Sequence, residues 1–531
     1  MRVTNNMITS NTKSNINANK VLVDKYNTQM TTQKKINKPS DDPVIAIRSL
    51  RMQTSLSHID QYLNNNISDA NSWLNVTDTA LENMKTILTD VRSLCVKGAT
   101  DTLKEDDRRT ILNQLKSLSD QIYAEGNADF SGRTVFTGYR TNKKLTFTED
   151  EQKTSYEIDQ KMSYADLQEH RYYGNDVTVP GNQADVLDGT KIASPTQAAY
   201  NRIRLGYDSI DSLDVTDAAG TTTKTSANGS TVTISYNYTD TTGTTPVNKT
   251  GNMNVTVYDS YDKWLEASTK TPKSYDIADG EAVLIRNTGE MVFSKTAADT
   301  LSTNKASLDI SYTKTGFTNG ELRPEYYYNC TNITDTNNKL KYEKYDKDGN
   351  QIYQDIDYVV AANQTLTVNT EASNVFDHGL SRDVDELIDA VQRSLDAEQK
   401  VTDLNAMKKM QEYSSDDCQA KLEEWIAAAK KERDYANDNM QKLYNSYIGN
   451  CDTYLQKVNL ALTDVGSKGQ SLALTKNRMS NEQETMEELK SKNEDRELSD
   501  IILEYTAAYT AYQSSLQAAS KVNQVTLLSY L

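Results

Sequence analysis

Two adjacent carboxylates stand between two prolines near the start of the sequence. The segment reads Asn37-Lys38-Pro39-Ser40-Asp41-Asp42-Pro43. A carboxylate pair can bind a cation or act in acid–base catalysis. A structural role explains it better, because Pro39 keeps Lys38 extended and Asp42 can cap a helix that starts at Pro43. We therefore predict a bend between two helices, formed by Pro39, Ser40, Asp41, Asp42 and Pro43.

The other residue types that catalyse reactions or hold metals are few and scattered. The histidines and cysteines are His58, His170, His378, Cys95, Cys330, Cys418 and Cys451. They form no HExxH or CxxC pattern, and the sequence has no Gly-rich phosphate loop or nucleophile motif. We expect no catalytic residue, no cofactor and no metal. Glycoside hydrolysis needs only two carboxylates at a suitable distance, so the 75 acidic residues leave open an inserted catalytic domain.

Charge and hydrophobicity restrict the partners. The net charge of −17 argues against nucleic acid or an anionic membrane as a partner. No run of 18 apolar residues occurs, and the first residues lack the apolar core of a signal peptide. We expect a protein that is either cytoplasmic or exported by a route without a cleaved signal.

Helix-breaking residues divide the chain into three parts. No proline lies between residues 44 and 179 or after residue 324, and 13 of the 21 glycines lie between residues 150 and 379. The two ends are therefore predicted to be helical, and the middle to be different.

The C-terminal segment from Leu498 to Leu531 carries one apolar stripe at helical spacing. A helix with so narrow a stripe needs a partner helix. Residues 1–38 are basic and residues 494–531 are acidic, which favours pairing of the two ends. We predict that one set of residues on this helix forms an interface with partner helices: Leu498, Ile502, Tyr505, Tyr509, Tyr512, Leu516, Ala519, Val522 and Leu528.

Two further stripes predict helices that pack within a subunit. One runs without a break from Leu56 to Cys95 and is followed by a second helix that folds back on it. The other runs from Met440 to Val465 and is interrupted by Gly466 and Gly469. The residues expected to pack between them are Leu63, Leu74, Leu81 and Leu88 on one side and Tyr447, Leu455, Val458 and Leu462 on the other.

The middle of the chain has the composition of antiparallel β structure. Short alternating runs are separated by Thr-, Gly- and Asn-rich turns, and a short helix is expected near Lys263. The segment Gly132–Tyr139 is predicted to be a short strand that enters this region.

These patterns predict an α+β fold. Long N- and C-terminal helices pair as a coiled coil into an elongated rod, and an inserted antiparallel β region projects from its far end. The expected parts are a pair of terminal segments made of residues 1–43 and 494–531, a rod made of 44–139 and 376–493 with a charged helical insertion near 400–435, and one or two β-rich modules in 140–375.

Several of these segments resemble the hook–filament junction proteins of the bacterial flagellin superfamily. The resemblance lies in Asn37–Pro43, in Gly132–Tyr139, in Val465–Met479, and in Tyr512–Ala519 with the terminal Leu527-Leu528-Ser529-Tyr530-Leu531. It covers about residues 1–140 and 436–531. Residues 140–375 and the charged helix at 400–435 lie outside it.

The resemblance implies a structural protein without an active site. Such proteins form a ring between a hook-side junction protein and the flagellin filament, and their terminal helices make an inner coiled-coil layer. The resemblance further implies an extracellular location in the flagellum, export through the flagellar apparatus without a cleaved signal, and binding of an export chaperone by the C-terminal helix.

Other functions compete with this one. A flagellin-like filament subunit is the first alternative, although the Pro39–Pro43 bend and the C-terminal Leu-Leu-Ser-Tyr-Leu favour the junction protein. A flagellin-type protein that carries an enzymatic insert is a more remote alternative. A cytoplasmic coiled-coil scaffold would not explain the β-rich middle.

Overall fold

The chain folds into two compact units that combine helices with a large sheet. The computed structural model describes residues 5–100, 103, 105–216, 221–240, 246–269 and 274–524. One unit, here the terminal unit, contains the residues up to Ser72, the segment Asp357–Thr367 and the residues from Lys468 onward. The other, here the central unit, contains Trp73–Ile356 and Val368–Ser467. The α+β class expected from the sequence is confirmed.

Long helices occupy both ends of the chain and the strands lie in its middle, as the composition predicts. The α-helices are α1 (Asn5–Thr32), α2 (Pro43–Asp60), α3 (Ser68–Gly98), α4 (Glu105–Glu125), α5 (Gln183–Leu187), α6 (Tyr261–Ala267), α7 (Lys295–Thr303), α8 (Gly379–Lys408), α9 (Asp416–Glu494) and α10 (Leu498–Gln524). The strands are β1 (Asp129–Phe130), β2 (Arg133–Thr134), β3 (Glu151–Ser163), β4 (Gln168–Gly174), β5 (Thr196–Arg204), β6 (Ser212–Thr216), β7 (Thr222–Thr225), β8 (Ser230–Asp240), β9 (Val247–Tyr258), β10 (Ala282–Ile285), β11 (Glu290–Phe293), β12 (Ser307–Phe317), β13 (Asn329–Asn332), β14 (Leu340–Tyr342), β15 (Asp357–Ala361) and β16 (Gln364–Thr367). A π-helical segment, η1 (Gln61–Ile67), joins α2 to α3.

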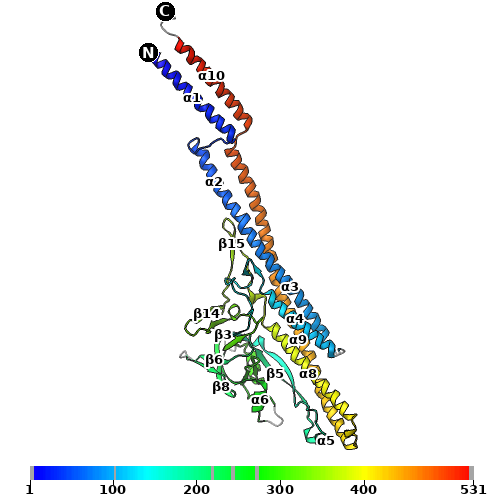
Figure 1. Cartoon of the computed structure of the whole chain (residues 1–531). Coiled ribbons are helices and arrows are strands. Elements are labelled where there is room, and N and C mark those ends of the chain that lie inside the picture. Colours follow the sequence, from blue (N-terminus) through cyan, green and yellow to red (C-terminus); the bar gives the residue numbers. More distant parts are fainter. Residues whose placement is uncertain are drawn as a thin grey trace, which may run out of the picture. The chain divides into compact units, whose positions relative to one another are not determined.

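In the terminal unit, helices from opposite ends of the chain lie side by side. α1 runs beside α10, and α2 runs beside the last part of α9 (Figure 1). Asn493 Nδ2 donates to the carbonyl of Ile45 at 3.1 Å, and Gln483 Nε2 donates to Asp60 at 2.6 Å. The hairpin β15–β16 packs on η1, where Asn66 Nδ2 donates to the carbonyl of Val359 at 2.7 Å.

The stripe that starts at Leu56 continues through η1, although the helix type changes there. Ile59 and Ile67 are buried, and Leu63 between them is half-buried. The steps from Ile59 to Leu63 to Ile67 are both four residues, which suits the wider turn of a π-helix. The segment therefore keeps one apolar face without the expected heptad spacing.

In the central unit, α3, α4, α8 and α9 share one apolar core. Val91, Leu115, Leu387 and Met440 are among its buried members, one from each helix. α3 and α9 approach closely at Gly98, because a Cβ atom there would lie 2.5 Å from the ring of Tyr444.

The charged stretch near 400–435 is the tip of the hairpin formed by α8 and α9. The apolar side chains of this tip form a separate core, which includes Leu404, Leu422 and Trp425. The loop that contains α5 covers it, and Trp425 Nε1 donates to the carbonyl of Val186 at 3.2 Å. The charges thus lie on the outside of a hairpin with a packed interior.

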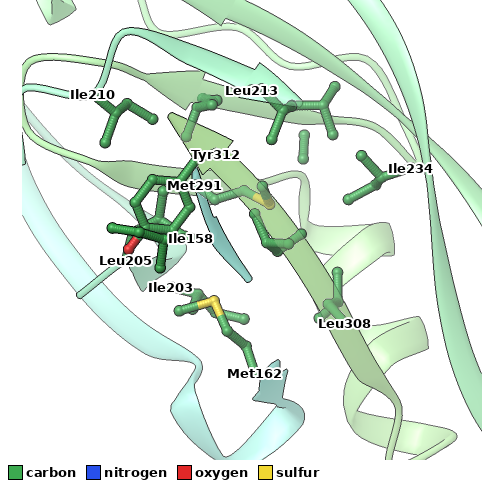
Figure 2. Packing of buried hydrophobic residues seen from close by; sticks show 14 of the residues in the cluster. Ile158, Met162, Ile203, Leu205, Ile210, Leu213, Ile234, Met291, Leu308 and Tyr312 are labelled. Atoms are coloured by element: carbon green, nitrogen blue, oxygen red, sulfur yellow. The ribbon is translucent and has the colours of Figure 1, made fainter. Parts of the chain in front are cut away.

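The largest sheet among the described residues has twelve strands and belongs to the central unit. Along the sheet the strand order is β14-β13-β3-β12-β8-β9-β10-β11-β5-β4, and β6 and β7 branch from β12. Buried side chains of several strands, such as Ile158, Ile203, Leu308 and Tyr312, pack together as its core (Figure 2).

The expectation of a purely antiparallel region is wrong at one pair of strands. β9 and β10 are parallel, with Val255 opposite Ala282. Parallel neighbours need a crossover connection. The connection here contains α6, the short helix expected near Lys263, whose Trp264 is buried against Val283 and Ile285.

Two local predictions are also wrong: that glycines interrupt the helix near residue 466, and that Gly132–Tyr139 is a strand. α9 continues through Gly466 and Gly469, because Val465 and Leu472 beside them are buried and packing outweighs the cost of about 1 kcal/mol for each glycine. Gly132–Tyr139 contains only the two-residue strand β2. Val135 and Phe136, which follow it, are both buried, which alternation in a half-exposed strand would not allow.

Two glycines provide a test of the sheet's packing. Gly289 and Gly229 both have positive φ, at 58° and 76°. A Cβ at Gly289 would lie 2.0 Å from the carbonyl oxygen of Tyr207, whereas a Cβ at Gly229 would meet nothing within 4 Å. Alanine at a positive φ costs about 1–2 kcal/mol in either variant. Gly289→Ala adds a steric cost of about 1–3 kcal/mol, because its Cβ meets the backbone of Tyr207.

We expect Gly289→Ala to lower the urea midpoint clearly more than Gly229→Ala does. Tryptophan fluorescence is the appropriate measurement, because Trp73, Trp264 and Trp425 all belong to the central unit. Equal midpoints for the two variants would contradict the close approach at Tyr207.

Candidate functional site

α1 and α10 pair along much of their length. The two helices are antiparallel, since Asn19 Nδ2 reaches the carbonyl of Ala511 at 3.5 Å while Lys34 pairs with Asp495 at the other end. The side chains turned toward the partner helix are half-buried or buried: Ile16, Asn19, Val23, Tyr26 and Gln29 on α1, and Ile501, Tyr505, Ala508, Tyr512, Ser515 and Ala519 on α10. Each set repeats in steps of mostly three and four, as in a two-helix coiled coil.

Polar contacts join the two chain ends where these helices begin and end. The backbone N–H of Lys35 donates to the carbonyl of Glu494 at 2.6 Å, and that of Arg496 donates to Gln33 at 3.0 Å. Lys34 Nζ lies 3.1 Å from Glu494 and 2.6 Å from Asp495. The hydrogen bond and charge of Asp495 raise the pKa of Lys34, so this lysine stays charged.

Two of the predicted bend residues form hydrogen bonds with the backbone of the turn between α1 and α2. Asp41 accepts hydrogen bonds from the N–H groups of Asn37 and Lys38 at 3.0 and 2.9 Å, and these bonds lower the pKa of Asp41. Asp42 accepts from the N–H groups at the start of α2, and Pro43 is the first residue of that helix. Pro39 and Ser40 are exposed. Both carboxylates are thus engaged with backbone donors.

The predicted interface residues of α10 fall into two sets. Tyr505, Tyr512 and Ala519 are half-buried in the helix pair. Leu498, Ile502, Tyr509 and Leu516 are exposed, as is Leu503, which is not in the predicted set. The side chain of Val522 and all of Leu528 lie outside the described residues.

α1 and α2 also expose apolar side chains. On α1 these are Met7, Ile8, Val21 and Leu22, and on α2 they are Val44, Ile47 and Leu50. Contiguous apolar surface on a soluble protein usually marks an interaction site. The described part of the terminal unit therefore exposes apolar side chains on α1, α2 and α10.

The residues predicted to pack within the rod occupy several places. Leu74, Leu81, Leu88, Tyr447 and Val458 are buried in the central unit, and Leu455 and Leu462 are half-buried there. Leu63 belongs to η1 in the terminal unit. Leu63 lies one turn from Asp60, which accepts a hydrogen bond from Gln483 of α9. This part of the chain is therefore next to the end of α9 and not next to the predicted 440–465 segment.

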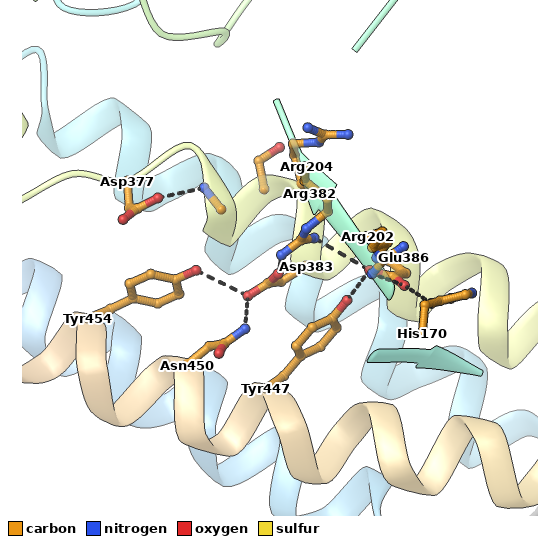
Figure 3. A network of polar contacts seen from close by, with 12 residues as sticks. His170, Arg202, Arg204, Asp377, Arg382, Asp383, Glu386, Tyr447, Asn450 and Tyr454 are labelled. Carbon is orange, nitrogen blue, oxygen red and sulfur yellow. Dashed lines mark hydrogen bonds and ion pairs between the residues drawn. The ribbon is translucent and has the colours of Figure 1, made fainter. Parts of the chain in front are cut away.

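A buried ionic network ties the sheet of the central unit to its helices (Figure 3). Arg202 of β5 donates through Nη1 to Glu290 of β11 and through Nη2 to Glu386 of α8, each at 2.6 Å. His170 Nδ1 lies 2.9 Å from Glu386, and Tyr447 of α9 donates to the same carboxylate at 2.6 Å. One carboxylate thus joins two strands and two helices.

A second carboxylate of α8 extends the network. Arg204 donates to Asp383, which also accepts from Asn450 at 2.8 Å and from Tyr454 at 3.1 Å. Arg382 donates to the carbonyls of Leu205 and Thr288.

Burial and charge act on these groups in opposite directions. Burial alone would raise the pKa of Glu386, but Arg202, His170 and Arg204 hold it well below its usual value. Burial raises the pKa of Asp383 more than Arg204 lowers it. Removing one partner from such a network typically costs about 3–5 kcal/mol, because it leaves a buried charge without compensation.

Sequence reasoning did not find this network. Two signals were present: the alternation Arg202-Ile203-Arg204 in a strand, and Asp383 and Glu386 three residues apart on a helix that is otherwise apolar on that face. Neither signal identifies the partners. For Arg202, these are Glu290 and Glu386, which lie 88 and 184 residues away in the sequence.

Within the described parts of the chain, no helix is both long enough and apolar enough to cross a membrane. Among the same residues, no group of three His, Cys, Asp or Glu side chains is placed to hold a metal ion.

His378, which precedes α8, makes the stability of the central unit depend on pH. Burial lowers the pKa of His378 to about 4 from 6.5, against the opposing charge of Asp377. Its Nε2 lies 3.0 Å from the hydroxyl of Tyr207. Between about pH 6.5 and pH 4 the unfolded chain therefore binds a proton at this site that the folded chain does not bind, and stability falls by up to about 3 kcal/mol as the pH is lowered.

We expect His378→Gln to lose less stability than the wild type when the pH is lowered from 7 to 4.5. The measurement is urea unfolding followed by tryptophan fluorescence at both pH values. His58→Gln is the control, because His58 is exposed on α2. A pH dependence identical in all three proteins would show that His378 does not contribute.

Comparisons with known proteins agree with the resemblance in the sequence. The sequence profile of the bacterial flagellin N-terminal helical region matches residues 3–141. Flagellar hook-associated protein 3 of Escherichia coli strain K12 is 28% identical over 130 residues, which are 24% of this chain and 40% of that protein. Its counterpart in Salmonella typhimurium strain LT2 is 27% identical over 142 residues, 27% of this chain and 44% of that protein. A flagellin of Clostridium tyrobutyricum is 25% identical over 139 residues, 26% of this chain and 37% of that protein.

Solved structures of similar proteins were also found. A flagellar hook-associated protein of Vibrio parahaemolyticus covers 86% of this chain and 100% of its own, with 13% identity and a TM-score of 0.34. The flagellar junction protein FlgL of Legionella pneumophila covers 80% of this chain and 98% of its own, with 12% identity and a TM-score of 0.26. The chain spans less than half the length of the curated relatives that it matches. The first quarter of the chain is thus similar to the flagellin N-terminal helical region, and these relatives confirm its resemblance to flagellar hook-associated protein 3.

Proposed function

We propose that this protein is a structural subunit of the bacterial flagellum that forms a ring at the hook–filament junction. Its copies associate through the helices of the terminal unit and adapt the hook to the filament. The observation that carries the proposal is the α1–α10 pair, which leaves Ile502, Tyr509 and Leu516 exposed on one side of α10. These residues are spaced by seven, so they form one apolar row along the helix.

The row is suited to helix–helix assembly. The α1–α10 pair buries one stripe of each helix, and a second apolar row on α10 has no partner among the described residues. A neighbouring copy can cover this row and the exposed Val21 and Leu22 of α1. The inner layer of the ring is then a coiled coil made of terminal helices from several copies.

The proposed arrangement of the subunit is a rod that carries the β region away from this inner layer. The support is that α9 supplies residues to both units, and that α3 pairs with it through Arg92 and Asp452, 2.7 Å apart. The polar composition of residues 140–375, rich in Thr, Gly and Asn, suits a position in solvent.

The other partners follow from the proposed place in the flagellum. They are the hook-side junction protein, flagellin, and an export chaperone that binds the C-terminal helix before export. The protein would leave the cell through the flagellar export apparatus and lie outside it.

We further propose that the protein is not an enzyme. Glu290 and Glu386 both pair with Arg202, and a glycosidase also uses two carboxylates. Arg202, His170 and Arg204 hold the pKa of Glu386 well below its usual value, so it is not a general acid. Hydrogen bonds from Arg202 and Tyr447 engage both of its oxygens, which leaves it poorly placed as a nucleophile. The pair therefore suits a structural ionic network rather than acid–base chemistry.

Substitution of an exposed residue of α10 tests the interface. Leu516→Asp places a charge in the apolar row, whereas Leu340→Asp places one on β14, and the two leucines are 43% and 49% exposed. We expect Leu516→Asp to leave the monomer folded and to reduce self-association at least about tenfold, and Leu340→Asp to have no such effect. Sedimentation velocity measures association, and circular dichroism measures folding. Equal association of both variants would contradict the proposed interface.

Electron microscopy of cells that lack the gene tests the place in the flagellum. The junction role predicts hooks without filaments and flagellin released into the medium. Filaments of normal length on intact hooks would refute it. Shortened or altered filaments on intact hooks would instead favour the alternative of a filament subunit, which the similarity to the Clostridium tyrobutyricum flagellin keeps open.

A further inference from the structure

A cleft of about 700 Å³ opens in the central unit beside the ionic network. One wall is made by β4 and β5, the other by α8 and α9, and the start of α6 and Tyr275 close one end. The volume lies within the range of about 300–1,000 Å³ that is typical of small-molecule sites. β4 is the last strand of the sheet, so the cleft lies along its edge.

Tyrosine rings form a continuous surface on the sheet side of the cleft. The ring centres of Tyr172 and Tyr200 are 5.4 Å apart, those of Tyr172 and Tyr275 5.0 Å, and those of Tyr261 and Tyr275 5.4 Å. All four residues line the cleft and are half-buried. Each ring thus packs against its neighbours and leaves part of its surface open to an occupant. Trp264 packs against this group, and its ring centre is 4.8 Å from that of Tyr275.

The base of the cleft contains donors without acceptors. Arg202 is only 4% exposed, and its Nε–H has no hydrogen-bond partner among the described residues. The buried hydroxyl of Thr288, which also lines the cleft, has none either. A buried polar group without a partner is costly, and such groups are commonly satisfied by a ligand or by water. Both atoms are themselves fully buried, so other groups of the lining must supply the donors for an occupant.

The charges of the lining do not favour a phosphorylated occupant. Arg171 pairs with Glu169 at 3.0 Å, Arg202 pairs with Glu290 and Glu386, and Lys442 pairs with Asp438 at 2.5 Å. Arg393 also lines the cleft and has no ion pair among the described residues, but the lining holds five carboxylates against four arginine and lysine side chains, so its net charge is not positive. A purely apolar occupant is also disfavoured, because the only aliphatic side chains longer than a methyl group among the lining residues belong to Leu443 and the stems of charged residues.

We propose that this cleft binds a saccharide. The C–H face of a pyranose ring can lie against the tyrosine surface, because tyrosine offers apolar area with a polar tip. Sugar hydroxyls can accept hydrogen bonds from Arg393 and Lys442 and donate to Asp389, which all line the cleft on the α8 and α9 side. A saccharide therefore suits both the aromatic wall and the mixed polar lining. This inference does not depend on ring assembly.

Binding to purified full-length protein tests the proposal. The probes are cellotriose, chitotriose, maltotriose and sialyllactose, each up to about 10 mM, which detects a dissociation constant in the millimolar range. Saturation-transfer NMR identifies the probe that binds, and calorimetry gives its affinity. We expect at least one of these probes to bind, and failure of all four would overturn the proposal.

Variants then locate the site. Tyr172→Ala and Tyr275→Ala remove parts of the aromatic wall, and we expect each to weaken binding at least about tenfold. Ser446→Trp fills the cleft from the α9 side at an exposed position and removes no core contact, so it should prevent binding in a folded protein. Tyr353→Ala is the control, because Tyr353 is 61% exposed and outside the cleft. Unchanged affinity in Ser446→Trp would place the sugar elsewhere and refute the inference.

Discussion

The long helices of this protein carry narrow apolar stripes, and the rest of the structure depends on the need to cover them. A helix of this kind is not stable alone in water and gains most of its stability from packing. The partners come from opposite ends of the chain: α1 meets α10 and α2 meets α9 in the terminal unit, and α3 meets α9 in the central unit. Because the ends are used to pair with each other, the sheet between them has to fold as an insertion whose entry and exit both lead to helices.

The second constraint is that the inserted sheet must be fixed to these helices. The ionic network does this with few residues, since Glu386 alone contacts Arg202, His170 and Tyr447. Such a network favours one arrangement of the sheet on the helices but adds little net stability, because the loss of hydration on burial offsets much of the attraction between the charges. It fixes the distance between the sheet edge and α8, and the cleft lined by tyrosines lies in the space that remains.

The sequence was most informative where a feature is local. The cap that Asp42 provides for α2, the short helix at Lys263 and the boundaries between helical and β-rich parts depend on residues only a few positions apart. Local signals failed where packing overrode them, as at Gly466 and Gly469 within α9, and where pairing is not local, as for the parallel strands β9 and β10. The sequence predicted one apolar stripe on α10, but its residues lie on two faces of the helix. Tyr505 and Tyr512 face α1, whereas Ile502 and Leu516 remain exposed.

The sequence by itself determined the amphipathic helices at both ends, the β-rich middle and the resemblance of the first quarter to flagellin-type helices, because periodicity and helix breakers are encoded along the chain. Only the tertiary structure decided which face of α10 packs on α1, and only it brought Arg202 to Glu290 and Glu386 and gathered Tyr172, Tyr200 and Tyr275 around one cleft. These residues are far apart in sequence. Their meeting depends on strand order, register and helix packing, and no short-range pattern specifies those.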